Sequence, residues 1–127
     1  MKKILKLVAI LFSAFLIVAC SKPKITKEQQ DNVVMWIVRG YEVKEVEFIS
    51  FTKNESTGTY ILKVKINNDD SMVSNLSIFH YEYLNSQDGI IALNPSNIFE
   101  SVTKETSLKY DDTVSISNIK IKYLGDR

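Results

Sequence analysis

The hydrophobic pattern of the chain begins with an apolar run. Residues 7–19 are apolar except for Ser13, and Lys2, Lys3 and Lys6 precede them. A basic start followed by an apolar stretch of this length is typical of a secretory signal peptide. The run is shorter than the roughly 20 apolar residues that cross a membrane comfortably. We therefore expect the chain to be exported.

The next pattern has the period of an α-helix and covers residues 26–39. Thr26 and Gln29 have the spacing of a capping box, and Gly40 follows the last periodic residue. Met35 and Val38 lie off the main apolar face, which favours a broad buried face over a contact with a partner. That apolar face is formed, at 100° per residue, by Val33, Val34, Ile37 and Tyr41, with Trp36 at its edge.

After Gly40 the pattern changes to the alternation that is typical of β-strands. The phase shifts at Ile49, which predicts a bulge in the first strand. Because alternation leaves one sheet face apolar, we expect an α+β domain in which a curved antiparallel sheet of four to five strands packs on the helix, as in cystatin-like rolls. The expected strands, with a short return before the last, are 43–51, 59–67, 76–84, 90–94 and 114–124.

The single cysteine, Cys20, stands where the apolar run ends. Ile17, Val18 and Ala19 precede it, and this order resembles the lipobox of bacterial lipoproteins. The resemblance implies cleavage after Ala19 and a diacylglycerol thioether on Cys20, which attaches the protein to the extracytoplasmic face of the cell membrane. A plain signal peptide, or a membrane span with an incidental cysteine, is the alternative.

Removal of residues 1–19 changes both the size and the charge of the protein. It leaves 127 minus 19, or 108 residues, which is enough for one domain. We expect residues 20–25 to be a lipidated linker and 26–127 to form a single domain. Three lysines leave with the signal, so 16 basic and 15 acidic side chains become 13 and 15, a net charge of about −2. This balance gives no indication of nucleic-acid binding.

Two lysines on the second expected strand suggest a basic stripe. Glu45 and Glu47 on the first strand lie on the same face if the intervening apolar residues point inward. The hairpin then brings these glutamates opposite Lys63 and Lys65, and such cross-strand pairs neutralise the stripe. We expect a structural role for these charges.

Few residues are suited to catalysis or to metal binding. His80 is the only histidine, so with Cys20 acylated no Cys/His pair and no two-histidine metal site remain. No G-x-S-x-G sequence accompanies His80. The turn 67–71 carries alternating oxygen ligands but lacks the glycine and glutamate of a calcium loop. We expect no catalytic residue, no metal and no cofactor other than the lipid, and an envelope hydrolase using His80 is the alternative.

The expected strand 76–84 carries apolar bulk on both faces. We favour burial of the aromatic face, which leaves the other face as an exposed apolar patch. If the aromatic face is exposed instead, its side chains form a surface of the kind enriched in interfaces. Either arrangement leaves a face for recognition. The candidate binding residues are Phe79, Tyr81 and Tyr83 on one face, and Ile78 and His80 on the other.

Residues 26–70 resemble small, functionally uncharacterised lipoproteins of low-GC Gram-positive bacteria. In that family a helix is followed by a strand, a turn that ends like Thr57-Gly58, a second strand and an Asn-Asn turn like the one at Asn67. The family's first turn carries a proline where this chain has none. The resemblance implies the fold and the location of the protein and no activity.

Together these patterns predict a non-enzymatic binding module at the membrane surface. Its partner is expected to be a protein or another envelope ligand, and immunity against a secreted toxin is one concrete version. The alternatives are an envelope hydrolase that uses His80 and a small ligand-binding accessory lipoprotein.

Overall fold

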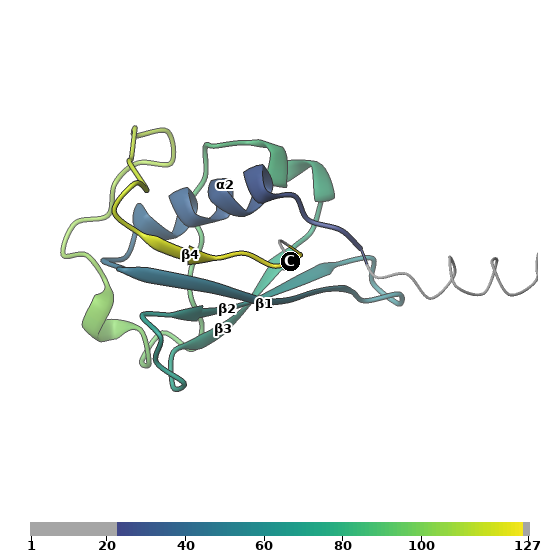
Figure 1. Ribbon diagram of the computed structural model, residues 1–127, viewed down its shortest axis with the longest axis horizontal. Helices are drawn as coiled ribbons and strands as arrows, with labels where there is room; N and C mark the ends of the chain where they lie inside the picture. Colours follow the sequence, from purple (N-terminus) through teal and green to yellow (C-terminus); the bar gives the residue numbers. More distant parts are fainter. Residues whose placement is uncertain (1–22, 126–127) are drawn as a thin grey trace, which may run out of the picture.

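The computed structural model describes residues 23–125, so the expected signal peptide and the candidate residues Ala19 and Cys20 lie outside the described residues. The described chain is an α+β domain with one α-helix and a four-stranded mixed sheet (Figure 1). Its elements are α2 (Lys27–Val38), β1 (Glu45–Lys53), β2 (Tyr60–Ile66), β3 (Val73–Ile78), the 3-10 helices η1 (Tyr81–Asn85) and η2 (Glu100–Val102), and β4 (Lys120–Lys122).

Helix α2 begins as the sequence predicts. The Thr26 hydroxyl accepts a hydrogen bond from the Gln29 backbone N–H, and the Gln29 side chain accepts one from the Thr26 N–H, which together form a capping box. Val38 is buried beside the main apolar face and Met35 is half-buried. The expectation of a broad buried face is therefore confirmed.

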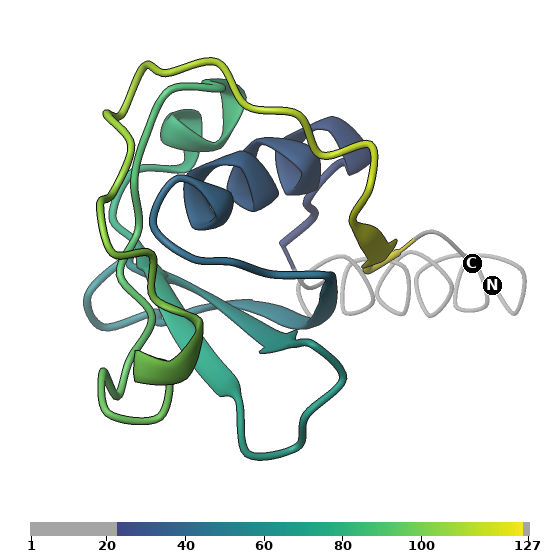
Figure 2. The same cartoon turned by 90° about the vertical axis from the view of Figure 1, so that its left-hand side faces the viewer.

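The sheet has the strand order β3-β2-β1-β4. Strands β1, β2 and β3 are antiparallel neighbours, but β4 pairs with β1 in parallel, so the expectation of a wholly antiparallel sheet is wrong. Parallel neighbours need a long connection, and here the segment 79–119 carries the chain from one sheet edge to the other. Figures 1 and 2 show its later part passing round the C-terminal end of α2, where the Leu108 N–H donates to the Arg39 carbonyl.

The bulge predicted in the first strand is confirmed. The register of β1 with β2 shifts between Phe48 and Ser50, so Ile49 has no partner and lies exposed. In a regular strand, residues three positions apart point to opposite faces. The extra residue of the bulge lets both Phe48 and Phe51 face the core.

Three of the expected strands are wrong in extent. Strand β3 runs from Val73 to Ile78, whereas the expected strand covered 76–84. Most of the residues after Ile78 in that range belong to η1. The 3-10 turn places Leu84 in the core although the chain has left the sheet after Ile78. Residues 90–94 form no strand, and of 114–124 only Lys120–Lys122 pairs with the sheet.

The expected charge pairs between β1 and β2 are half correct. Glu47 lies opposite Lys65 in the register, and their charged atoms are 3.6 Å apart. Glu45, by contrast, pairs with β4, where its carboxylate lies 3.5 Å from the Lys122 ammonium. Lys63 lies opposite Ser50, just past the bulge, and faces no glutamate.

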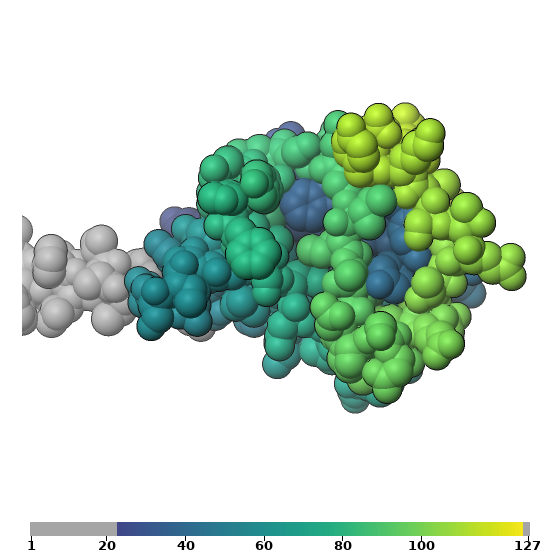
Figure 3. Space-filling model, turned by 180° about the vertical axis from the view of Figure 1, so that it is seen from behind, coloured from purple at the N-terminus to yellow at the C-terminus, as the bar shows by residue number. Residues whose placement is uncertain are grey.

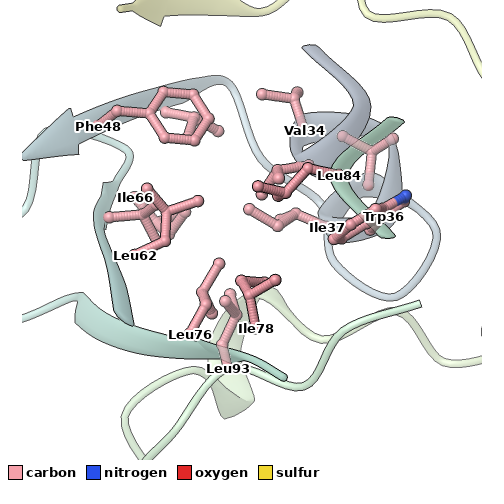
Figure 4. Close-up of a cluster of buried hydrophobic side chains, with 14 of the residues drawn as sticks. Val34, Trp36, Ile37, Phe48, Leu62, Ile66, Leu76, Ile78, Leu84 and Leu93 are labelled. Atoms are coloured by element: carbon pink, nitrogen blue, oxygen red, sulfur yellow. The ribbon is translucent and has the colours of Figure 1, made fainter. Parts of the chain in front are cut away.

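The hydrophobic core lies between α2 and one face of the sheet (Figure 4). Side chains from the helix point toward those of β1, β2 and β3, and residues of η1 and of the segment after it close the far side. Burial of these side chains is the main source of the stability of the fold. The labelled core residues are Val34, Trp36, Ile37, Phe48, Leu62, Ile66, Leu76, Ile78, Leu84 and Leu93.

Candidate binding groove

A surface groove of about 380 Å³ lies between the end of β3 and the segment 86–91. In Figure 3 a blue part of the chain, which is the helix region, is visible at the bottom of a hollow between green segments. Trp36 of α2, which is almost fully buried, is the helix residue that lines the groove. We call this site the Trp36 groove. Its two walls are Ser77, Ile78 and Phe79, and Gly89, Ile90 and Ile91.

Large apolar side chains around the groove are exposed to solvent. Phe79 is 68% exposed, Tyr83 is 56% exposed and Ile90 is 48% exposed. Three such side chains beside one apolar hollow are unusual on a protein surface, where exposed apolar residues are normally scattered. The residues beneath these side chains are well buried, so the hollow lies on a packed part of the domain.

The structure separates the five candidate binding residues. Ile78, Phe79 and Tyr83 line the Trp36 groove, whereas Tyr81 and His80 are not among its lining residues. The expectation that the three aromatic side chains share one buried face is wrong, because the chain turns into η1 after His80 and the strand alternation ends there.

Tyr81 takes a structural position between the sheet and the start of the chain. Its ring packs against Tyr60, with centroids 5.4 Å apart, and against Phe51. Its hydroxyl donates to the carbonyl of Lys24 at 2.7 Å. Tyr81 therefore fixes the point where the N-terminal segment enters the domain.

Trp36 holds the segment that forms the second wall. Its indole N–H donates to the carbonyl of Ser86 at 3.0 Å. Gly89 has φ +151° and lies so close that an added Cβ would be 3.0 Å from two atoms of the Trp36 ring. The position requires a glycine both for its backbone and for this approach.

Arg39 supports the same wall from below. It is buried, and its guanidinium donates to the carbonyls of Gln87, Gly89 and Asp112 at 2.6, 2.8 and 3.0 Å. Three charge-assisted bonds from one rigid side chain keep the loop in a single conformation. The wall is thus preorganised although it has no regular secondary structure.

The electrostatics of the groove are acidic. Among the described residues that line it, Asp88 is the only Asp, Glu, Lys, Arg or His, and the exposed Glu82 of η1 lies nearby in sequence.

The resolved pKa shifts belong to the β2–β3 turn, where hydrogen bonds from Ser71 lower the pKa of Asp69 and a hydrogen bond to Asp70 raises the pKa of Lys65. That turn is at the opposite end of β3.

The candidate ligands for a metal are dispersed over the described chain. Within residues 23–125 no group of three His, Cys, Asp or Glu side chains is placed to hold a metal ion. In the turn 67–71, the Asp69 carboxylate accepts bonds from both the N–H and the hydroxyl of Ser71. None of the helices in this part of the chain is long and apolar enough to span a membrane.

Several residues of the groove were missed by sequence reasoning. Trp36 and Arg39 were assigned to the helix and its stop, and the segment 86–91 to a turn and a strand. The available signal was the pair of isoleucines directly after the turn residues Asp88-Gly89, because binding residues lie disproportionately on loops.

Comparisons of the chain with protein families, curated proteins and solved structures give no match. The resemblance of residues 26–70 to small lipoproteins therefore stays a prediction.

Proposed function

We propose that the protein is an exported, lipid-anchored lipoprotein whose domain is a non-enzymatic binding module for another protein. The observation that carries this proposal is the Trp36 groove, in which Phe79, Tyr83 and Ile90 are exposed on a preorganised base. Aromatic side chains held in this way are characteristic of the energetically important part of protein interfaces. The ordering cost of binding is small because the groove is already formed.

The position of the groove suits a partner at the membrane surface. Lys24 is held by Tyr81, which lies two residues before the groove residue Tyr83 in η1. If Cys20 carries the lipid, the four peptide units from Cys20 to Lys24 span at most about 14 Å. The domain then stays near the headgroups, with the groove accessible to a protein that arrives there.

The architecture supports a further assignment. We propose that the helix and the bulged sheet belong with the cystatin-like rolls, since α2 covers one face of the sheet and the bulge at Ile49 bends β1. The parallel strand β4 is a departure from that pattern.

The absence of an enzymatic role is also a proposal, and it rests on His80. The His80 side chain is 59% exposed, and its Nδ1 lies 3.9 Å from the Glu82 carboxylate. No hydrogen bond within residues 23–125 joins its ring to a serine hydroxyl, as a nucleophile–base pair requires. Its ring instead packs edge-on against Tyr83, at 5.0 Å between centroids.

Protection from a secreted toxin of sibling cells is the concrete version that we propose to test. A deletion strain is complemented with the wild type, with Phe79→Ser/Tyr83→Ser, with His80→Ala, or with Tyr110→Ser. Tyr110 is the matched control, because it is a similarly exposed aromatic residue outside the groove. We expect the double variant to behave like the deletion in competition with sibling cells, and the other two to protect like the wild type.

Two results would contradict the proposal. If the deletion strain is no more sensitive than the wild type, the immunity version fails. If His80→Ala alone removes protection while the groove variant keeps it, the envelope hydrolase is the better account.

A further inference from the structure

The free edge of β3 presents backbone groups that the sheet does not use. The last residue of β2 and the residue after it bond to opposite neighbours: the Ile66 N–H donates to the Met72 carbonyl, on the β3 side, and the Asn67 N–H donates to the Glu45 carbonyl of β1. With the observed register, Ser74, Leu76 and Ile78 are the β3 residues whose backbone faces β2.

The alternate residues of β3 therefore point their N–H and C=O groups away from the sheet. These are Val73, Asn75 and Ser77, and β3 is an edge strand. Within residues 23–125, no hydrogen bond from a loop, a cap or a side chain reaches their backbone groups. An edge of this kind is a template for pairing with another extended chain.

The open edge leads directly into the Trp36 groove. Ser77 is exposed and belongs to the first wall, while the second wall does not pair with it: the Gly89 N–H donates to Tyr110, and the Asn94 N–H donates to the Ser74 hydroxyl. The segment 89–91 thus runs beside β3 without joining the sheet. The space between them has one wall of unpaired backbone and one of isoleucine side chains.

We propose that the groove binds an extended peptide segment of the partner protein, added to the sheet as a fifth strand along β3. The segment's backbone bonds to Ser77 and Asn75, and an aliphatic or aromatic side chain enters the groove above Trp36. A lysine or arginine of the segment lies against Asp88. This inference rests on the proposed function and specifies the class of ligand.

Both the hydrogen-bonding groups and the charge of the site select this occupant. Strand addition uses main-chain bonds for affinity and pockets for alternate side chains for specificity, and the site offers both. The Asp88 carboxylate favours a cationic segment and opposes the anionic surface of a bilayer. A membrane contact through Phe79 and Tyr83 is therefore the disfavoured occupant.

The test uses the full chain in detergent micelles and a display library of random peptides of about nine residues, a length that covers one strand. Trp36 is the only tryptophan, so its emission reports binding at the groove directly. We expect enriched peptides to alternate apolar and polar residues and to carry Lys or Arg. Enrichment of helical or unpatterned peptides, or no enrichment at all, would overturn the proposal.

Backbone N-methylation of the best peptide tests strand pairing without altering the protein. Methyl groups at alternate positions, where the N–H faces β3, are expected to weaken binding by about tenfold each, and those at intervening positions by less than about twofold. An N-methyl profile without this alternation rules out the added strand.

The protein side is tested with Ser77→Pro, which removes one outward N–H, and with Ser77→Ala as its matched control. Proline is tolerated at an edge position whose N–H is not used by the sheet. We expect about tenfold weaker binding for Ser77→Pro and, because alanine keeps the N–H, less than about twofold weaker binding for Ser77→Ala.

The two proposals fail in different ways. Peptides that shift Trp36 emission and need Phe79 and Tyr83, but tolerate Ser77→Pro and every N-methyl group, would refute the added strand and leave the binding module standing. Phosphatidylglycerol vesicles that displace the selected peptide from the groove would overturn the choice of a protein segment. The proposed function fails separately if Phe79→Ser/Tyr83→Ser protects cells in competition as well as the wild type does.

Discussion

At the scale of single residues, the shape of the groove depends on Arg39, which does not line it, and on the glycine at position 89. Arg39 donates three hydrogen bonds to loop carbonyls, and Gly89 permits the approach of the loop to Trp36. A sequence pattern marks neither role, because the partners of Arg39 are backbone atoms some fifty to seventy positions away. Only the folded chain brings them together.

Replacement of Gly89 by alanine is expected to distort the groove. The new Cβ would meet the Trp36 ring at 3.0 Å, and φ +151° is strained for alanine, so we expect a loss of about 1–3 kcal/mol in the free energy of unfolding. We also expect a shift in Trp36 emission. Gly58→Ala is the control, because its φ of +75° is also unfavourable but no atom lies within 4 Å of the new Cβ. Equal emission changes in both variants would contradict the account.

Asp69 gives a residue-scale prediction about pH. Hydrogen bonds from the Ser71 hydroxyl and N–H lower the pKa of Asp69, so the carboxylate stabilises the turn above the unfolded pKa. This contribution is lost as the pH falls through the folded pKa. We expect the Ser71 amide resonance to titrate with a midpoint below the roughly 3.9 of an unperturbed aspartate. A midpoint at or above that value would refute the hydrogen bonds.

At the scale of elements, the sequence predicts what periodicity and local signals can encode. The capping box of α2, the bulge at Ile49 and the alternation of β2 all appear in the structure. The direction of β4 and the end of β3 do not follow from the pattern, because parallel and antiparallel strands share the same period. Leu84 fits a strand in sequence, yet it is buried from a 3-10 turn.

Thr26→Ala tests the start of α2. The variant loses the hydroxyl that accepts the Gln29 N–H, and we expect it to lower the free energy of unfolding by about 1 kcal/mol. Urea unfolding followed by Trp36 emission provides the measurement. Thr106→Ala, at an exposed loop position, is the matched control and should leave the midpoint unchanged. A stability loss that is the same for both variants would contradict the capping role.

At the scale of the whole molecule, the two edges of the sheet differ. The three-residue β4 forms one edge beside β1, while the longer β3 forms the other and leaves its outward backbone groups available next to the Trp36 groove. Near the start of the described chain, the carbonyl of Lys24 is held by the Tyr81 hydroxyl. An attached lipid at Cys20 would keep the domain, with its open edge, close to the membrane surface.

The most direct measurement of this account uses single thiols introduced into the lipid-anchored protein. Ser77→Cys places a thiol at the open edge and groove, and Asn118→Cys places one before β4, at the opposite sheet edge. A membrane-impermeant maleimide is added to intact cells in mixed culture and, separately, to the purified protein.

We predict that both thiols are labelled on intact cells. At about 90% occupancy of the groove, the Ser77→Cys thiol reacts about tenfold more slowly on cells than on the purified protein, and Asn118→Cys reacts at the same rate in both. Equal rates for Ser77→Cys on cells and in solution, or labelling only after the membrane is permeabilised, would contradict the account.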